Sequence, residues 1–357
     1  MRSFPAILTL LIVAGMTQLA AAQESCATAC NSCGSGECST CQQCDTSCCE
    51  DCNSCCDTSC SECTQGCFSR IIDGLCYDDG CAYYSCKPRL LGIFAPTDTR
   101  FQNFISPMTN PVYFEDPRTL TEARAIFLNH WLPRGVGGSD IQVFAVQARA
   151  ALTKRLSIIA TKDGYIFSAG NGPPIDGWAN VNLGLKYNLY ADADRQQLLS
   201  IGTRFELVSG SVSALQHIGT GLFDVFLTGG TQVGELSHFV SAAGFRLPTD
   251  PYAQNDQFYW SFHLDRRLRQ APLYGLLEMN WYHWMNSGVG GIPGVGGLDL
   301  YNLGSSGVAG QNIVTGAVGA KYKLSALNEI GVAWEAPMTN QRDVMASRLT
   351  ADLILRY

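Results

Sequence analysis

Apolar and polar residues alternate along most of the chain from residue 119 to its end. In residues 349–357 every second side chain is apolar, and the positions between them are polar except Ile354. A period of two residues predicts a β-strand with one apolar and one polar face. The same alternation recurs in residues 179–189, 199–207, 258–265, 314–324 and 329–335. Several of these stretches stay regular for about ten residues, beyond the roughly five or six of an ordinary strand.

This pattern predicts about twelve strands, and the connections between them alternate in length between short turns and longer loops. The predicted strands are residues 119–130, 141–151, 154–168, 178–190, 196–208, 222–230, 237–247, 257–265, 272–284, 312–324, 328–336 and 344–357. A bulge or a hairpin turn fits Asp163-Gly164 inside the third strand. We expect an all-β fold, an antiparallel transmembrane β-barrel of about 12 strands. In such a barrel the last strand must pair with the first, because lipid tolerates no open sheet edge.

The polar face of these strands is expected to point inward. An Arg or Lys side chain that faces lipid at mid-bilayer costs about 2–4 kcal/mol. The predicted lumen-lining residues are Asn180, Asn182, Lys186, Asn188, Arg204, Glu206, Tyr259, His263, Glu278, Asn280, Lys321, Lys323, Glu329, Glu335, Arg348 and Asp352. Aromatic residues near strand ends predict two interfacial girdles, or alternatively ordinary core aromatics. These are Trp178, Tyr187, Tyr190, Trp281, Trp284 and Tyr357.

The start of the chain predicts export. Residues 1–22 combine Arg2, a short apolar stretch and a run of alanines at residues 20–22, which is typical of a cleaved signal peptide. The alternative is an N-terminal membrane anchor. No later run of eighteen apolar residues is present, so we expect no membrane-spanning helix.

The chain has 17 cysteines, and all lie within residues 24–86. This segment also carries ten acidic residues and one basic residue, Arg70. It has too few apolar residues to form a core without cross-links. Helical steps of three and four residues connect Cys41, Cys44, Cys48, Cys49, Cys52, Cys55, Cys56, Cys60 and Cys63. Disulfides, metal binding through Cys-x-x-Cys and an acidic spacer are the three interpretations.

For two segments the sequence allows a location either inside or outside the barrel. Residues 87–118 contain five prolines and many aromatic side chains, so they form either a periplasmic linker or a plug in the lumen. Residues 119–357 form the predicted barrel. The glycine-rich residues 288–310 form the longest connection, and their glycine content favours a flexible loop outside the barrel over one that folds inward.

Little in the sequence indicates catalysis. His263 and Glu278 fall on adjacent predicted strands, where we expect a hydrogen bond rather than an acid–base pair. The chain has no Gly-x-Ser-x-Gly elbow, phosphate loop or dinucleotide fingerprint, so we predict neither an enzyme nor a cofactor. The formal net charge of −7 argues against nucleic acid as a partner.

Four stretches together resemble a family of outer-membrane barrels. They are FISPMTNPVYFEDP at residues 104–117, LTEARAIF at residues 120–127, SIIATKDGYI at residues 157–166 and EMNWYH at residues 278–283. The family is described as transporter-like and as related to barrels of phenol-degradation pathways. The resemblance covers about residues 96–357. It implies an outer-membrane barrel that passes small, hydrophobic compounds, and it implies no catalytic residues.

Three hypotheses follow. The first is an outer-membrane channel or transporter for small solutes, with a disulfide-stapled periplasmic extension. The second is a structural envelope protein that is cross-linked through its cysteines to another copy or to an envelope partner. The third is a metal-binding module on a barrel anchor. Outer-membrane lipid of a Gram-negative-type envelope is the expected surrounding in each case.

Overall fold

The computed structural model describes residues 89–168, 175–268 and 271–357, of which residues 89–356 form one compact unit. Its β-strands are β1 (Glu122–Trp131), β2 (Asp140–Ala151), β3 (Leu156–Lys162), β4 (Tyr165–Phe167), β5 (Asp176–Trp178), β6 (Val181–Asp192), β7 (Gln197–Leu207), β8 (Leu222–Val233), β9 (Ser237–Pro248), β10 (Gln257–Arg267), β11 (Leu273–Trp284), β12 (Asn312–Lys323), β13 (Glu329–Pro337) and β14 (Ser347–Arg356). Three short 3₁₀ helices accompany them: η3 (Thr99–Phe101), η4 (Arg134–Val136) and η5 (Val212–Ala214). Among the described residues, no helix has both the length and the hydropathy needed to cross a membrane.

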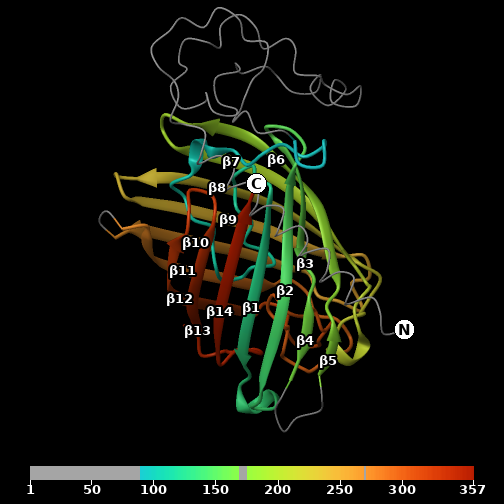
Figure 1. Ribbon diagram of the computed structural model, residues 1–357. Coiled ribbons are helices and arrows are strands. Elements are labelled where there is room, and N and C mark those ends of the chain that lie inside the picture. Colours follow the sequence, from blue (N-terminus) through green and yellow to red (C-terminus); the bar gives the residue numbers. More distant parts are fainter. Residues whose placement is uncertain (1–88, 169–174, 269–270) are drawn as a thin grey trace, which may run out of the picture. The chain divides into compact units, whose positions relative to one another are not determined.

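The strands form one closed antiparallel barrel (Figure 1). Strand β1 pairs with β2 on one side and with the last strand, β14, on the other. Strand β4 continues β3 along β2, and β5 precedes β6, so the ring has twelve spanning strands. The predicted twelve-stranded antiparallel barrel is therefore confirmed.

The predicted starts of the first and last strands are each three residues too early. The first strand begins at Glu122 rather than at residue 119, because the preceding residues bond to a neighbouring segment. The Thr119 carbonyl accepts the Asp98 N–H, and the Thr121 N–H is donated to Thr97 Oγ1. The last strand begins at Ser347 rather than at residue 344, because residues 338–346 form a loop.

A bulge-like break, not a hairpin, interrupts the third spanning strand at Asp163-Gly164. Strands β3 and β4 on either side both pair with β2, which a hairpin turn would prevent. The Asp163 carboxylate accepts the Val146 N–H at 3.1 Å, and this bond replaces a lost ladder hydrogen bond. Gly164 has a φ of +109°, and a Cβ on it would lie 2.4 Å from the Phe144 carbonyl oxygen. Only glycine fits this position without strain.

The polarity of the barrel is inverted relative to a soluble protein. Large apolar side chains on its outward face are exposed, among them Leu185, Phe223, Leu227, Val318, Val332 and Trp334. The inward positions of the same strands carry buried charged and amide side chains. An apolar exterior around a polar interior is typical of a barrel that faces lipid.

The aromatic residues near strand ends do not behave alike. Trp178, Tyr187 and Tyr190 are exposed on the outward face, as an interfacial girdle requires. Trp284 is only 2% exposed, and its indole packs against Gly296 of the long glycine-rich connection. The girdle assignment of Trp284 is therefore wrong.

Candidate functional site

The lumen contains the predicted lining residues. Lys323 is partly buried, and the other fifteen are buried inside the barrel, namely Asn180, Asn182, Lys186, Asn188, Arg204, Glu206, Tyr259, His263, Glu278, Asn280, Lys321, Glu329, Glu335, Arg348 and Asp352. The cysteine candidates from Cys41 to Cys63 lie outside the described residues. Among the residues that are described, no group of three His, Cys, Asp or Glu side chains is arranged to hold a metal ion.

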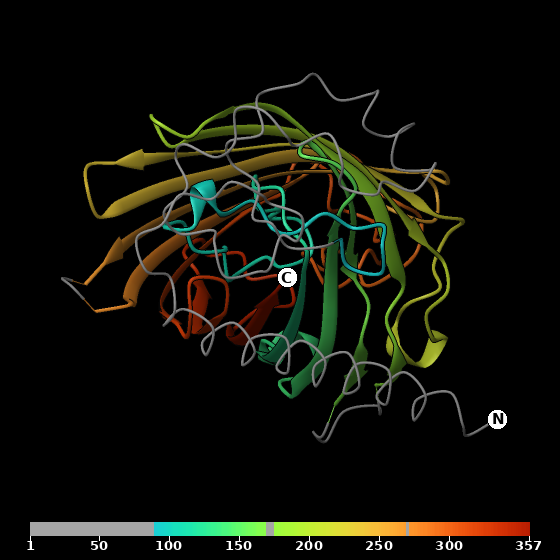
Figure 2. The same ribbon diagram turned by 45° about the horizontal axis from the view of Figure 1, so that its top comes forward.

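Residues 104–118, here called the inserted segment, run inside the barrel (Figure 2). The Glu278 carboxylate accepts the backbone N–H groups of Met108 at 2.8 Å and Thr109 at 2.6 Å. On other strands, Arg204 donates to the Val112 carbonyl at 2.6 Å and Lys321 donates to the Ser106 carbonyl at 2.9 Å. The segment therefore contacts the wall on several sides, as a plug would.

The inserted segment also brings charges into the lumen. Glu115 pairs with Arg149 and with Lys186, and the three side chains are at most 2% exposed. Asp116 pairs at 2.7 Å with Arg118, its neighbour on the same segment. Because these groups are removed from water, each depends on its partner for compensation.

Two arginine-centred clusters join several strands of the wall. Arg356 on β14 pairs with Glu122 on β1 at 2.7 Å and with Glu329 on β13 at 2.6 Å. The same seam holds Asp352, which pairs with Arg124 at 2.8 Å and with Lys321 at 2.9 Å. These pairs cross the junction where the barrel closes.

The second cluster joins β3, β7, β8, β9 and β10. Glu206 accepts from Lys162 at 2.6 Å and from Arg246 at 3.2 Å. Arg204 pairs with Asp224, which also accepts the Tyr259 hydroxyl at 2.9 Å.

Tyr113 of the inserted segment packs into this second cluster. Its ring stacks on Tyr259 with 4.9 Å between centroids, and the Arg246 guanidinium lies 4.6 Å above the Tyr113 ring. The aromatic face and the cation thus hold the segment against the wall.

The expected hydrogen bond between His263 and Glu278 is present at 2.6 Å. The other ring nitrogen of His263 lies 3.2 Å from Asp265, which also contacts His238 at 2.9 Å. Both ring nitrogens of His263 therefore face carboxylate oxygens, and the ring links Asp265 to Glu278, which anchors the inserted segment.

Sequence reasoning missed several charged residues of the lumen. They are Glu115, Asp116, Arg118, Glu122, Arg124, Arg149, Lys162, Asp224, Arg246, Asp265, Asp299 and Arg356. Those on strands follow the two-residue period, except Lys162 at the register shift of β3, so extending the same register rule would have found all of them but Lys162. Glu115, Asp116, Arg118 and Asp299 lie on segments without periodicity and gave no such signal.

Residues 288–310, here called the inserted loop, also fold inward, so the prediction of an outside loop is wrong. Leu298, Asp299 and Val308 are fully buried. Arg348 donates to both carboxylate oxygens of Asp299, at 2.8 and 2.9 Å. These apolar and charged side chains give the loop partners inside the lumen, which outweigh the mobility of its glycines.

Asp343, in the connection between β13 and β14, holds the inserted loop by backbone contacts. Its carboxylate accepts the N–H groups of Gly296 at 2.6 Å and Gly297 at 2.8 Å, and also that of Val344 at 2.7 Å. Burial raises the pKa of the Asp343 carboxyl, and the three N–H groups lower it only in part. The folded loop therefore binds this proton more tightly than a solvated aspartate would.

Acidification is accordingly expected to tighten the inserted loop. Its folded arrangement gains stability as pH falls from the raised pKa toward the ordinary value of about 3.9. Hydrogen exchange at Gly296 and Gly297, corrected for intrinsic rates, should show more protection at about pH 4 than at about pH 7. The difference should vanish in Asp343→Asn and persist in the control Asp250→Asn. Protection that falls on acidification would contradict the expectation.

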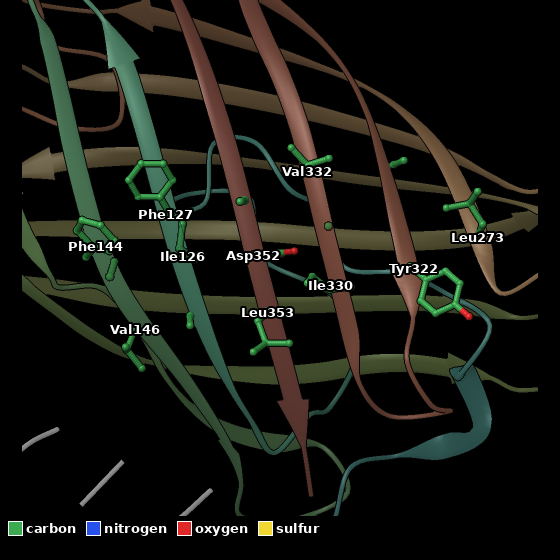
Figure 3. A pocket seen from close by; sticks show the side chains of 15 residues that line it. Ile126, Phe127, Phe144, Val146, Leu273, Tyr322, Ile330, Val332, Asp352 and Leu353 are labelled. Carbon is green, nitrogen blue, oxygen red and sulfur yellow. The ribbon is translucent and has the colours of Figure 1, made fainter. Parts of the chain in front are cut away.

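An apolar hollow of about 780 Å³ lies on the outward face of the wall, over β2, β1, β14, β13 and β12 (Figure 3). Ala125, Ala320 and Ala351 form its small side chains. Larger residues such as Phe144 and Tyr322 surround it. Asp352 is the one charged residue among those that line the hollow, and its carboxylate pairs with Arg124 and Lys321 in the lumen.

Comparisons with known proteins bear on the fold. No family model matches the chain, and no curated protein matches it. An outer-membrane channel from Pseudomonas putida is similar in structure at 11% sequence identity, covering 71% of this chain and 100% of that chain with a TM-score of 0.50. The NanC porin matches at 9% identity, 66% of this chain, 98% of that chain and a TM-score of 0.41. The KdgM porin, solved with disordered oligogalacturonate, matches at 8% identity, 66% and 99% coverage and a TM-score of 0.39.

At such low identity these similarities concern the fold alone, and only the first has a TM-score high enough to support an argument. Two statements stay predictions, namely that the chain is not an enzyme and that it needs no cofactor. The closed ring of strands and the first structural match together show that this chain has the fold of a twelve-stranded outer-membrane β-barrel channel.

Proposed function

We propose that this chain is an outer-membrane channel for small solutes, closed in the present conformation by the inserted segment and the inserted loop. The inverted polarity of the closed sheet carries this proposal. Exposed apolar side chains suit hydrocarbon, and a closed ring leaves no backbone group unpaired in lipid. We accordingly place the barrel in the outer membrane of a Gram-negative-type envelope, with both termini on the periplasmic side.

The polar filling of the lumen supports a channel over a purely structural anchor. Buried ion pairs are often no more stabilising than well-packed apolar residues of similar volume. A barrel that served only as an anchor would gain nothing from an ionised interior. The inserted segment is held mainly by charged and carbonyl groups, whose hydrogen bonds water can replace when the segment moves.

Conductance measurements on the full chain in planar bilayers test the proposal. The wild type should open rarely. Removing two anchors of the inserted segment in Glu115→Ala/Glu278→Ala should release it and produce frequent conductance steps, because Glu278 holds Met108 and Glu115 binds the wall. The exposed residue Glu235 provides a matched control, and Glu235→Ala should behave as the wild type.

The absence of conductance steps in the wild type and in the double variant alike would overturn the channel. Heat-modifiable migration on a detergent gel would first establish that each variant has folded as a barrel.

We further propose that residues 24–86 form a periplasmic extension stapled by disulfides, with the signal peptide removed at about residue 22. The concentration of all 17 cysteines in this part of an exported chain supports it. Cross-linking to another copy or to an envelope partner, and metal binding, are the alternatives. Gels without reductant distinguish a cross-linked chain from a monomer, and elemental analysis for zinc and copper tests the metal.

A further inference from the structure

Glu115 is bound to the lumen wall in the way that a protein binds a free carboxylate. Arg149 on β2 donates from Nε to Oε1 at 2.8 Å and from Nη2 to Oε2 at 2.8 Å. Lys186 on β6 donates to Oε1 at 2.8 Å. The paired parallel hydrogen bonds of a guanidinium to a carboxylate are the geometry by which arginine selects this planar anion.

The two cations depend on the inserted segment for much of their compensation. Both hydrogen bonds of Lys186 go to that segment, one to Glu115 and one to the Asp116 carbonyl. Arg149 has a wall partner, Glu122, at 2.9 Å, but Glu122 also holds Arg356. Within the described residues, the carboxylate that forms an ion pair with Lys186 is that of Glu115. Withdrawal of Glu115 would therefore leave a cationic site in a poorly solvated wall.

The inserted loop repeats this relationship at a second place. Asp299 presents both carboxylate oxygens to Arg348 on β14, whose wall partner is Glu335 at 2.7 Å. Each of the two segments that close the lumen thus brings one carboxylate to a wall arginine. The two contacts lie on different segments and different strands, so they are independent observations.

We propose that Arg149 and Lys186 form a binding site for small carboxylate anions in the lumen wall, and that Glu115 occupies this site as an internal mimic while the lumen is closed. The binding chemistry rests on the contacts above. That the anion is a solute to be passed rests on the proposed channel. The site favours carboxylates over neutral amides of the same shape, because two charged donors face the ligand.

Chemical rescue tests the site without any measurement of conductance. Glu115→Ala removes the carboxylate and leaves room where acetate fits. The heat-modification midpoint of this variant should rise with acetate at about 100 mM, and should not rise with acetamide or with chloride at equal ionic strength. In Glu115→Ala/Lys186→Met the effect of acetate should be lost or greatly reduced. If Glu115→Ala fails to fold, its refolding yield with acetate or acetamide replaces the midpoint as the measurement.

The outcomes separate this proposal from the channel. An equal response to acetate and acetamide, or an unchanged acetate effect in the double variant, would overturn the carboxylate site even if the barrel conducts. Rescue by acetate in a barrel that never conducts would support the site and remove the channel. Rescue together with anion-selective conductance in Glu115→Ala, reduced by added acetate, is the expected result.

Discussion

Replacing Arg149 with methionine is expected to destabilise the folded barrel by about 3–5 kcal/mol, since it removes one of the two cations that compensate each of two buried carboxylates. Arg149 is the shared cation of Glu115 and Glu122, whose carboxylates are fully buried. Methionine keeps much of the side-chain volume, so the loss reports on charge rather than on a cavity. Urea unfolding of the barrel, followed by heat-modifiable migration, measures the change in the free energy of unfolding.

An exposed pair gives the matched control for this substitution. Arg195 lies 3.9 Å from Asp192, and its side chain is 75% exposed. Arg195→Met should therefore cost less than about 1 kcal/mol. Equal effects of Arg149→Met and Arg195→Met would show that the lumen is wet enough to solvate Glu115 and Glu122, contrary to their burial.

The second large effect concerns the outward face. Val318 lies near the middle of β12 and is 54% exposed. Val318→Arg should reduce the free energy of folding into lipid vesicles by about 2–4 kcal/mol, because it places a charge against hydrocarbon. Equilibrium urea titrations in vesicles of one lipid composition measure this difference.

The same change near the end of that strand is its control. Tyr322 shares the outward face of β12 but lies one residue from its last residue, Lys323. There Tyr322→Arg should cost about 0–1 kcal/mol, because the side chain reaches the interface. Equal costs at Val318 and Tyr322 would contradict a lipid-facing band, as would a mature chain that is monodisperse without detergent.

The barrel could be predicted from sequence because its main signal is local. In a strand, residues two positions apart lie on the same face, so the local alternation of apolar and polar residues indicates which face each residue takes. The predicted and observed bounds of β7, 196–208 and Gln197–Leu207, differ by one residue at each end. Errors arose at residues 119–121, where contacts with Thr97 and Asp98 replace strand pairing, and at residues 344–346, where the Met345 N–H donates to the Arg342 carbonyl within the loop.

The filling of the lumen could not be predicted in the same way. Met108 and Glu278 are 170 residues apart, and neither position indicates the other. A linker outside the barrel and a segment within it have the same proline and aromatic content. For the inserted loop, the glycine-rich composition indicated a mobile loop outside the barrel. It gave no sign that Asp299 binds Arg348 or that the Gly296 N–H donates to Asp343.

The position of the inserted segment also constrains how the molecule is built. It precedes β1 in the chain, yet it bonds to Glu278, Lys321 and Arg356, up to 250 residues later. Ordering contacts over such separations is slow. A finished ring would also have to be threaded by some fifteen residues that carry three charges. Biogenesis is simpler if the early strands bind this stretch first and the final hairpin, β13 and β14, closes around it. The lumen would then be filled before β14 pairs with β1.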